Sequence, residues 1–172
     1  MPNDGRLVEI VTYRPAARDG QDALRQAECV RQLRNEVVAD LTRSNKEITS
    51  DAQWVWWQSA AARQRHIYIV EAATVDEPDK TFAGFGMIQP ITGQGWLTGA
   101  LRARYRGQGI GRRLFEFLIR ECQHVGLEPW LEVFQDNEIA KRLYVKLGFA
   151  WVEVKSGPNG RRILVGKYNR GE

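Results

Sequence analysis

The chain has 172 residues, of which 43% are hydrophobic and 27% are charged. This length predicts one compact domain with a sizeable core, and the composition argues against a disordered chain. Two cysteines and two histidines exclude both a disulfide-rich scaffold and a metal centre with the usual zinc spacing. Lys and Arg number 25 against 21 Asp and Glu, a mild excess that does not indicate a nucleic-acid partner. Because we find no apolar run of membrane length and no signal peptide, we expect a cytoplasmic protein with no membrane partner.

Hydrophobic periodicity predicts two helices and four strands in the first 102 residues. A β-branched, alternating run from 7 to 13 predicts the first strand, and apolar residues at helical spacing from 24 to 41 predict the first helix. The sequence Ser50-Asp51-Ala52-Gln53 has the form of a capping box and predicts the start of a second helix. Three further alternating runs predict strands at 66–71, 81–89 and 96–102.

The second half of the chain predicts two helices and three more strands. The expected bounds are a helix at 109–125, a strand at 130–134, a helix at 137–147, and strands at 149–155 and 162–167. Asp136 or Asn137 can cap the later helix, and Gly126 and Gly148 stand where helix C-caps favour glycine. The order β-α-α-β-β-β-α-β-α-β-β predicts an α/β fold with a mixed sheet flanked by helices.

A glycine-rich turn lies between the expected strand at 96–102 and the helix at 109–125. Glycines let backbone N–H groups approach a ligand closely, and a helix start adds free N–H groups and a positive dipole end. This arrangement favours a phosphate ligand. The turn lacks the Gly-Lys-Ser/Thr of a Walker loop, and Arg112 or Leu114 stands where a dinucleotide fingerprint needs its last glycine. A plain strand-to-helix turn stays an alternative.

Two segments match motifs of one known family. The pattern R/Q-x-x-G-x-G/A matches Arg106-Gly107-Gln108-Gly109-Ile110-Gly111. The pattern L-x-V followed by N-x-x-A-x-x-x-Y-x-x-x-G-F matches Leu131-Glu132-Val133 with Asn137, Ala140, Tyr144, Gly148 and Phe149. With both motifs in order, the chain resembles the Gcn5-related N-acetyltransferases, although Ala103 stands where many members have proline. The resemblance implies one N-acetyltransferase domain over residues 1–172, with the acyl-CoA N-acyltransferase fold and splayed parallel central strands.

The resemblance also implies acetyl-CoA as cosubstrate and assigns its binding residues. The pyrophosphate would lie on the turn, the pantetheine arm would follow the preceding strand, and Asn137 would touch the arm, cap its own helix, or do both. The implied cofactor-binding residues are Gly99, Leu101, Arg106, Gly107, Gln108, Gly109, Ile110, Gly111 and Asn137.

For catalysis, the resemblance implies that Tyr144 protonates the departing thiolate, with a packing role as the alternative. The strand before the turn carries no carboxylate, so the base that accepts the amine proton is left open between Glu132, Glu71 and a water chain. Cys29 and Cys122 are expected to be small buried groups and not acyl carriers. No metal is expected.

The acceptor is expected to be a small primary amine. Arg34-Asn35, Ile48-Thr49 and Gln53-Trp54 are similar to pairs in family members that act on small amines, including amino sugars carried on nucleotides. Four cations, namely Arg31, Arg34, Arg43 and Lys46, would oppose a basic peptide. At least one of Trp54, Trp56 and Trp57 should face outward. A homodimer stays open, and the alternative function is a non-catalytic CoA-binding sensor or interaction module.

Overall fold

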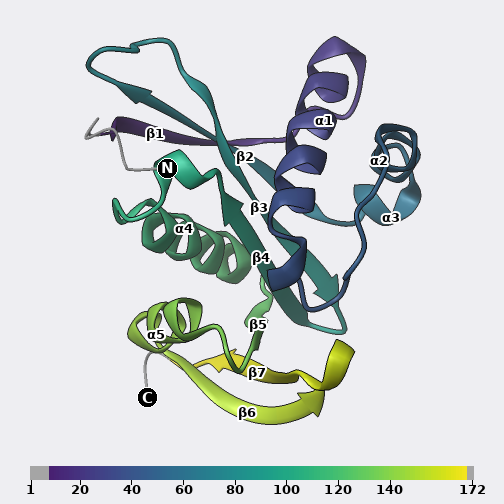
Figure 1. The fold of residues 1–172 in the computed structure, drawn as a ribbon, viewed down its shortest axis with the longest axis vertical. Helices are drawn as coiled ribbons and strands as arrows, with labels where there is room; N and C mark the ends of the chain where they lie inside the picture. Colours follow the sequence, from purple (N-terminus) through teal and green to yellow (C-terminus); the bar gives the residue numbers. More distant parts are fainter. Residues whose placement is uncertain (1–7, 170–172) are drawn as a thin grey trace.

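Seven strands form one mixed sheet in residues 8–169, the part of the chain that this computed structural model describes (Figure 1). Their order across the sheet is β1-β2-β3-β4-β5-β7-β6, and β4 and β5 are the parallel neighbours among otherwise antiparallel pairs. The strands are β1 Val8–Pro15, β2 His66–Thr74, β3 Thr81–Ile91, β4 Gln94–Leu101, β5 Glu128–Phe134, β6 Phe149–Ser156 and β7 Arg162–Tyr168. The predicted mixed α/β fold is confirmed. Residues 1–7 and 170–172, which include the first residue of the first predicted strand, lie outside the described range.

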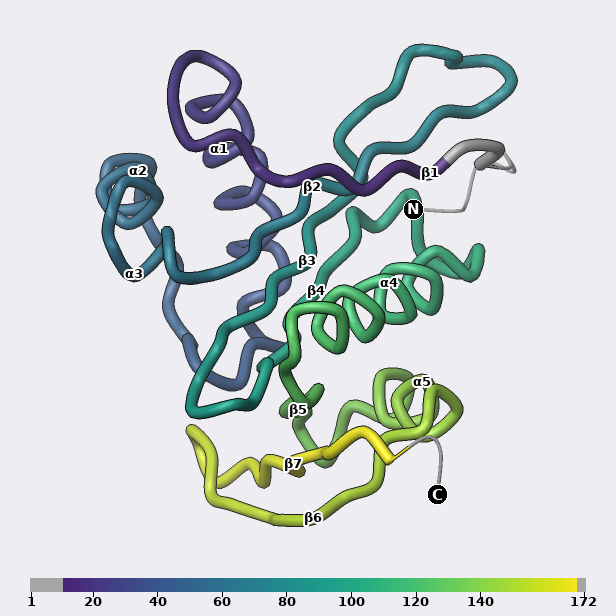
Figure 2. Tube along the Cα trace, turned by 180° about the vertical axis from the view of Figure 1, so that it is seen from behind, coloured from purple at the N-terminus to yellow at the C-terminus, as the bar shows by residue number. Residues whose placement is uncertain are grey.

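Helices cover both faces of the sheet (Figures 1 and 2). The α-helices are α1 Gly20–Glu36, α2 Ser50–Trp57, α3 Ala60–Arg63, α4 Ile110–His124 and α5 Glu138–Leu147, and short 3-10 helices span Val38–Asp40, Ala103–Tyr105 and Pro158–Gly160. Alternation along β2 separates two cores, because successive side chains point to opposite faces. Tyr68 and Val70 pack with α4, whereas Ile67 and Ile69 pack with α1.

Three glycines let α4 lie unusually close to β3 and β4. A Cβ built on Gly95 would stand 2.3 Å from the Cys122 sulfur, and one on Gly86 would stand 2.9 Å from Leu118 Cδ2. A Cβ on Gly99 would stand 3.1 Å from Leu114 and Phe115. The lack of side-chain bulk at these three positions of β3 and β4 therefore has a packing reason. It fixes the position of α4, and with it the position of the glycine-rich turn at its N-terminus.

Two local predictions were wrong, each for a physical reason. The first helix ends at Glu36 and not near 41, because the β-branched pair Val37-Val38 leads into a 3-10 turn. The cap of α2 is Thr49, whose hydroxyl accepts from Ala52 N at 3.2 Å, so Ser50 is the first helical residue. A further short helix, α3, follows α2 and is capped by Ser59; it was not predicted from the sequence. Among the described residues, no helix has the length and apolar character that crossing a membrane requires.

Candidate functional site

The site is built where β4 and β5 separate. The two strands pair at three positions, Gln94–Glu128, Gly95–Pro129 and Trp96–Trp130. Beyond Trp130, β5 continues its pairing with β7 on its other side, while β4 continues with β3. Figure 1 shows the result, with β6 and β7 standing apart from β1–β4. The splay of the parallel central strands is thus present, and it leaves one edge of β4 open from Leu97 onward.

The open edge of β4 presents backbone hydrogen-bonding groups to the gap. The Arg102 N–H donates to the Ala83 carbonyl of the neighbouring segment at 2.8 Å. Because such groups alternate in direction along an antiparallel ladder, the N–H and C=O of Leu101 and Gly99 point away from β3, toward β5. The Leu101 carbonyl accepts from Arg106 Nε at 3.0 Å. Both strand residues that the family motif implies therefore face the gap with backbone groups.

The glycine-rich turn presents the start of α4 to solvent. Gly107 and Gly109 have φ values of +75° and +78°, a left-handed conformation that favours glycine, and a Cβ at either position would have no atom within 4 Å. The first backbone hydrogen bond of the helix runs from Arg113 N to Gly109 O at 3.2 Å. The N–H groups of Ile110 and Gly111 therefore have no carbonyl of the helix to bind.

The side chains of the turn have structural partners of their own. Besides the Arg106 bond to Leu101 O, the Gln108 amide donates to Arg104 O at 3.2 Å. Ile110 is buried in the core beneath α4. The open approach and the free N–H groups of the helix start fit a pyrophosphate, which backbone groups of this turn would bind.

Tyr144 and Asn137 lie on α5, across the gap from β4. The Tyr144 ring packs against Phe115 and Phe149, with centroids 5.0 and 6.1 Å away, and its side chain lines a cavity together with Gly99. Burial in this apolar environment raises the pKa of its hydroxyl, so the hydroxyl stays protonated at neutral pH. The Asn137 Oδ1 accepts from Ala140 N at 3.2 Å, so Asn137 caps α5.

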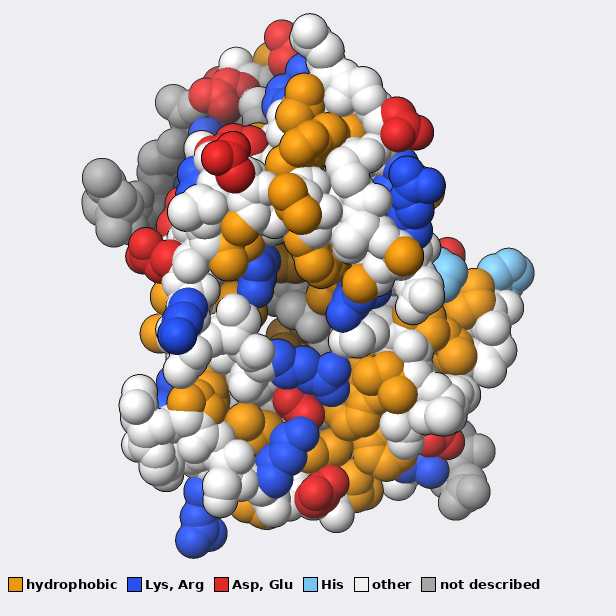
Figure 3. Space-filling model, turned by 90° about the vertical axis from the view of Figure 1, so that its right-hand side faces the viewer, with side chains coloured by type: hydrophobic (Ala, Val, Ile, Leu, Met, Phe, Trp, Pro, Cys, Tyr) orange, Lys and Arg blue, Asp and Glu red, His pale blue; other side chains and the backbone are white. Residues whose placement is uncertain are grey.

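A cavity of about 360 Å³ lies between α1, the 40–48 loop, α2 and the splayed strands. Figure 3 shows a hollow on this side of the molecule, with Lys and Arg side chains around its mouth. Trp56 and Trp96 line the cavity, and each carries a guanidinium over its ring, Arg65 at 5.6 Å and Arg43 at 4.8 Å from the centroid. Trp57 is buried, and its indole N–H donates to Ala17 O at 2.9 Å. Of the three tryptophans in α2, Trp56 and Trp57 line the cavity and Trp54 does not.

Glu132 lines the cavity as an ionised carboxylate, and both of its oxygens have partners. Its side chain is 4% exposed, and one oxygen accepts from Thr42 at 3.0 Å and from Arg43 Nε at 3.4 Å. Lys155 pairs with the other oxygen. Burial pushes its pKa upward, but Lys155, Arg43 and Thr42 together bring the pKa below its usual value. This environment weakens Glu132 as a proton acceptor.

The other candidate groups lie away from the cavity. Glu71 pairs with Arg14 on the edge strand β1 and does not line the cavity. Cys122 lies on the buried face of α4, where burial raises the pKa of its thiol to about 11, and such a thiol is a poor nucleophile at neutral pH. Cys29 is half-buried in α1. Within residues 8–169, no group of three or more His, Cys, Asp or Glu side chains is placed to hold a metal ion.

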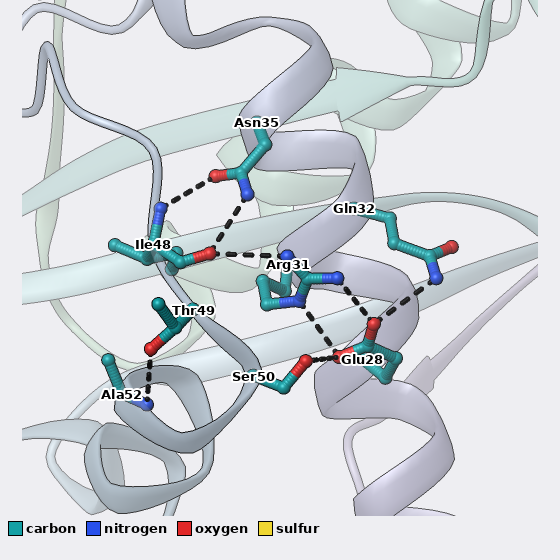
Figure 4. Close-up of polar contacts among 8 residues, drawn as sticks. All are labelled: Glu28, Arg31, Gln32, Asn35, Ile48, Thr49, Ser50 and Ala52. Carbon is teal, nitrogen blue, oxygen red and sulfur yellow. Dashed lines mark hydrogen bonds and ion pairs between the residues drawn. The ribbon is translucent and has the colours of Figure 1, made fainter.

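A polar latch holds the cavity loop against α1 (Figure 4). Asn35 accepts from Ile48 N at 3.0 Å and donates to Ile48 O at 2.9 Å, and Arg31 adds a bond to the same carbonyl at 3.2 Å. Glu28 binds Arg31 and accepts from the Ser50 hydroxyl at 3.0 Å; the Arg31 hydrogen bond lowers the pKa of Glu28 to about 2. The latch fixes the start of α2, and it occupies Arg31, one of the four cations predicted near the pocket.

Several site residues were missed by sequence reasoning. They are Thr42, Arg65, Trp96 and Lys155. Thr42 lies 90 residues from Glu132, and Lys155 lies 23 residues from it. Local spacing carries no signal for contacts of this kind, since they depend on how distant segments pack.

Comparison with known proteins agrees with this geometry. The profile of the Acetyltransferase (GNAT) family matches residues 30–149. An N-acetyltransferase structure from Staphylococcus aureus Mu50 has a TM-score of 0.75 at 16% identity, covering 94% of this chain and 99% of that one. A protein from Salmonella typhimurium described as an acetyltransferase, solved with its cofactor acetyl-CoA, has a TM-score of 0.73 at 15% identity, covering 95% and 96%.

A curated relative is named a [ribosomal protein bS18]-alanine N-acetyltransferase and comes from Haemophilus ducreyi. It is 34% identical over 68 residues, which are 37% of this chain and 47% of that protein, so the match spans about half of the relative. The family profile covers well over half of the chain described here, including the cavity loop, the glycine-rich turn and Tyr144. The chain therefore belongs to the acetyltransferase (GNAT) family.

Proposed function

We propose that the chain transfers the acetyl group of acetyl-CoA directly to a primary amine of a small molecule, with amino sugars as the first class to test. The observation that carries this proposal is that Tyr144 and Gly99, one from each family motif region, line one cavity although they lie on separate elements. The cavity of about 360 Å³ falls within the range of small-ligand pockets. The cavity face of Trp56 offers a surface on which a sugar ring can stack.

The proposed cofactor site follows the open backbone groups. The N–H groups at Ile110 and Gly111 would bind the pyrophosphate, because the helix start is positive there. The edge of β4 at Gly99 and Leu101 would bind the amides of the pantetheine arm as an added strand does. Arg106 and Gln108 would act by holding the shape of the turn through their bonds to backbone carbonyls. Asn137 would reach the arm with the amide nitrogen that its cap leaves available.

In the proposed reaction, the neutral amine attacks the thioester carbonyl, a C–N bond forms and the C–S bond breaks. N–H groups on the open edge of β4 would stabilise the oxyanion that develops. The Tyr144 hydroxyl then gives its proton to the departing sulfur, and the proton that the newly acylated nitrogen loses returns to Tyr144 through water. An ordinary thiol has a pKa of about 8.5 and a phenol about 10. The apolar surroundings that raise the pKa of Tyr144 disfavour a thiolate as well, so the two groups stay matched.

The acceptor amine must lose a proton, since an alkylammonium has a pKa of about 10.4. Glu132 lines the cavity and was a candidate base. Its three donors lower its pKa and so oppose that role. We therefore assign the proton to water at the cavity mouth. Glu132 then acts as a positioning residue that ties the cavity loop to β5 and β6 through Thr42, Arg43 and Lys155.

The acceptor class is tested by a thiol-release assay with acetyl-CoA. The panel holds amino sugars, nucleotide-linked amino sugars, polyamines, lysine-rich peptides and a peptide that begins with alanine, each at low and moderate salt. We expect a small amine to give the highest kcat/KM. A peptide as best acceptor would contradict the small-molecule proposal. If none of the acceptors in the panel gave any thiol release, the non-catalytic CoA-binding alternative would be favoured.

Acetyl-CoA should stabilise the protein through the glycine-rich turn. At a ligand concentration 100-fold above Kd, linkage gives about 2.7 kcal/mol. Gly109→Val should abolish this increment, because a branched side chain would stand in the approach to the helix start. The matched control is Gly160→Val, since Gly160 has a similar φ of +74° and equally open surroundings in the β6–β7 hairpin. The increment in Tm is measured for both variants, and an increment that survives in Gly109→Val would contradict the assigned turn.

Tyr144→Phe should lower kcat about 10²- to 10⁴-fold with little change in the KM for acetyl-CoA, because the hydroxyl acts as the thiolate leaves. The control is Tyr168→Phe, which removes a hydroxyl from the same aromatic cluster at a residue that does not line the cavity. Steady-state kinetics on both variants measure the effect. Equal turnover in the parent and in Tyr144→Phe would return Tyr144 to a packing role.

Glu132→Gln should destabilise the protein by about 1–3 kcal/mol at pH 7, since Lys155 and Arg43 lose their carboxylate partner. The folded-state pKa of Glu132 lies below 4.5, so its contribution is complete above that pH and is lost as pH falls through the folded pKa. Urea unfolding of parent and variant between pH 7 and pH 3 should therefore show their difference shrinking toward acid, while the exposed control Glu153→Gln shows none. A kcat loss of 10²-fold or more, relieved as pH rises, would instead make Glu132 the base.

A further inference from the structure

Arg34 brings a positive charge into the cavity that no described residue neutralises. It stands in the last turn of α1, half-buried, and lines the cavity. Within residues 8–169, no carboxylate or carbonyl forms an ion pair or hydrogen bond with its guanidinium. Burial lowers its pKa, which reports the cost of holding this charge away from bulk water. The dipole at the C-terminus of α1 offsets part of that cost. The guanidinium N–H groups still have no hydrogen-bond acceptor in the described part of the chain.

Gln53 is the second residue of the same cavity lining whose hydrogen-bond donor has no acceptor within residues 8–169. It is 2% exposed, lines the cavity from α2, and its Nε2 is buried without a hydrogen-bond partner among the described residues. Buried amide nitrogens almost always have an acceptor, because an unpaired donor forfeits its hydration. A side chain of this kind facing a cavity indicates an acceptor atom that a ligand would supply.

The other charged side chains of the cavity lining already interact with residues of the protein. Arg43 binds Glu132 and donates to Gln89 at 3.0 Å. Arg65 donates to the Ala61 carbonyl, and its guanidinium lies over the Trp56 ring. The acidic group of the lining besides Glu132 is Asp40, whose charge acts on Arg161. Arg34 is therefore the cation that stays available for a ligand in this lining.

We propose that Arg34 and Gln53 form an oxyanion-binding subsite in the acceptor cavity, so that the acceptor carries a carboxylate or a phosphate in addition to its amine. This inference rests on the proposed acetyl transfer to a small molecule and names the chemical class of that molecule. The planar guanidinium can donate two parallel hydrogen bonds to either oxyanion, and the Gln53 amide adds a third. Trp56 lines the same cavity and offers an apolar face to the carbon skeleton between anion and amine.

The test uses matched acceptor pairs that differ by the anion. The pairs are alanine with alaninamide, and glucosamine 6-phosphate with glucosamine, so the two arms distinguish a carboxylate from a phosphate source. For at least one pair, the parent protein should favour the anionic member in kcat/KM. Arg34→Met should lower kcat/KM for that member about 10- to 100-fold, mainly through KM, and leave the neutral member nearly unchanged. Arg34→Lys should restore part of the loss, because it keeps the charge without the planar fork.

The control is Lys46→Met, which removes an exposed cation of the same segment that does not line the cavity. Parallel measurements use lactate and glucose 6-phosphate, which carry the two anions without an amine. At least one of them should raise the Tm of the acetyl-CoA-loaded parent and of Lys46→Met, and not that of Arg34→Met or Gln53→Leu. This readout needs no turnover, so it separates the subsite from the acetyl-transfer proposal.

Two results would overturn the subsite. The first is a parent protein that prefers the neutral member of both pairs, and the second is an Arg34→Met variant that loses equally on both members of a pair. Absence of acetyl transfer to every acceptor, with the Tm increment from lactate or glucose 6-phosphate retained, would overturn the proposed function and leave the anion subsite standing.

Discussion

The end of the ladder between β4 and β5 is the constraint on which the site depends. After Trp96 and Trp130 the two strands take different partners, so backbone groups on one edge of β4 have no strand to bind. Such groups are costly if buried and unpaired, which means that the gap must be filled by water or by a ligand with amides of its own. The gap is therefore a binding site made by topology, before any side chain adds specificity.

Polar ties set the width of the acceptor cavity on both of its sides. The latch of Asn35 and Arg31 holds the loop to α1, and Glu132 holds the same loop to the splayed strand. Lys155 on β6 completes the second tie, so the C-terminal hairpin is joined electrostatically to the N-terminal half. The Glu132 carboxylate is buried while both of its cations are partly exposed, so removing either cation would leave the buried charge less well compensated.

Sequence reasoning succeeded where structure is local. The glycine-rich turn, the Asn137 cap and the helix ends at Gly126 and Gly148 depend on a few neighbouring residues, and each lies where it was expected. The end of α1 and the additional helix α3 were missed because small propensity differences decide them within a tertiary context. The partners of Glu132 were missed for a stronger reason: Thr42 and Lys155 reach it from distant parts of the chain, and no spacing rule joins them.

The predicted excess of cations near the pocket illustrates the same limit in electrostatic terms. A count of charges along the sequence treats Arg31 and Arg34 alike. Arg31, however, pairs with Glu28 and donates to Ile48 O, whereas Arg34 lines the cavity. One helical turn contains both, and their surroundings give them opposite roles. A half-buried cation that lines a cavity acts on a ligand more strongly than exposed cations do, because salt largely screens interactions between exposed charges more than about 10 Å apart. In the proposed subsite, recognition of an acceptor therefore depends on which single charge lacks a partner, and this is a property of the fold.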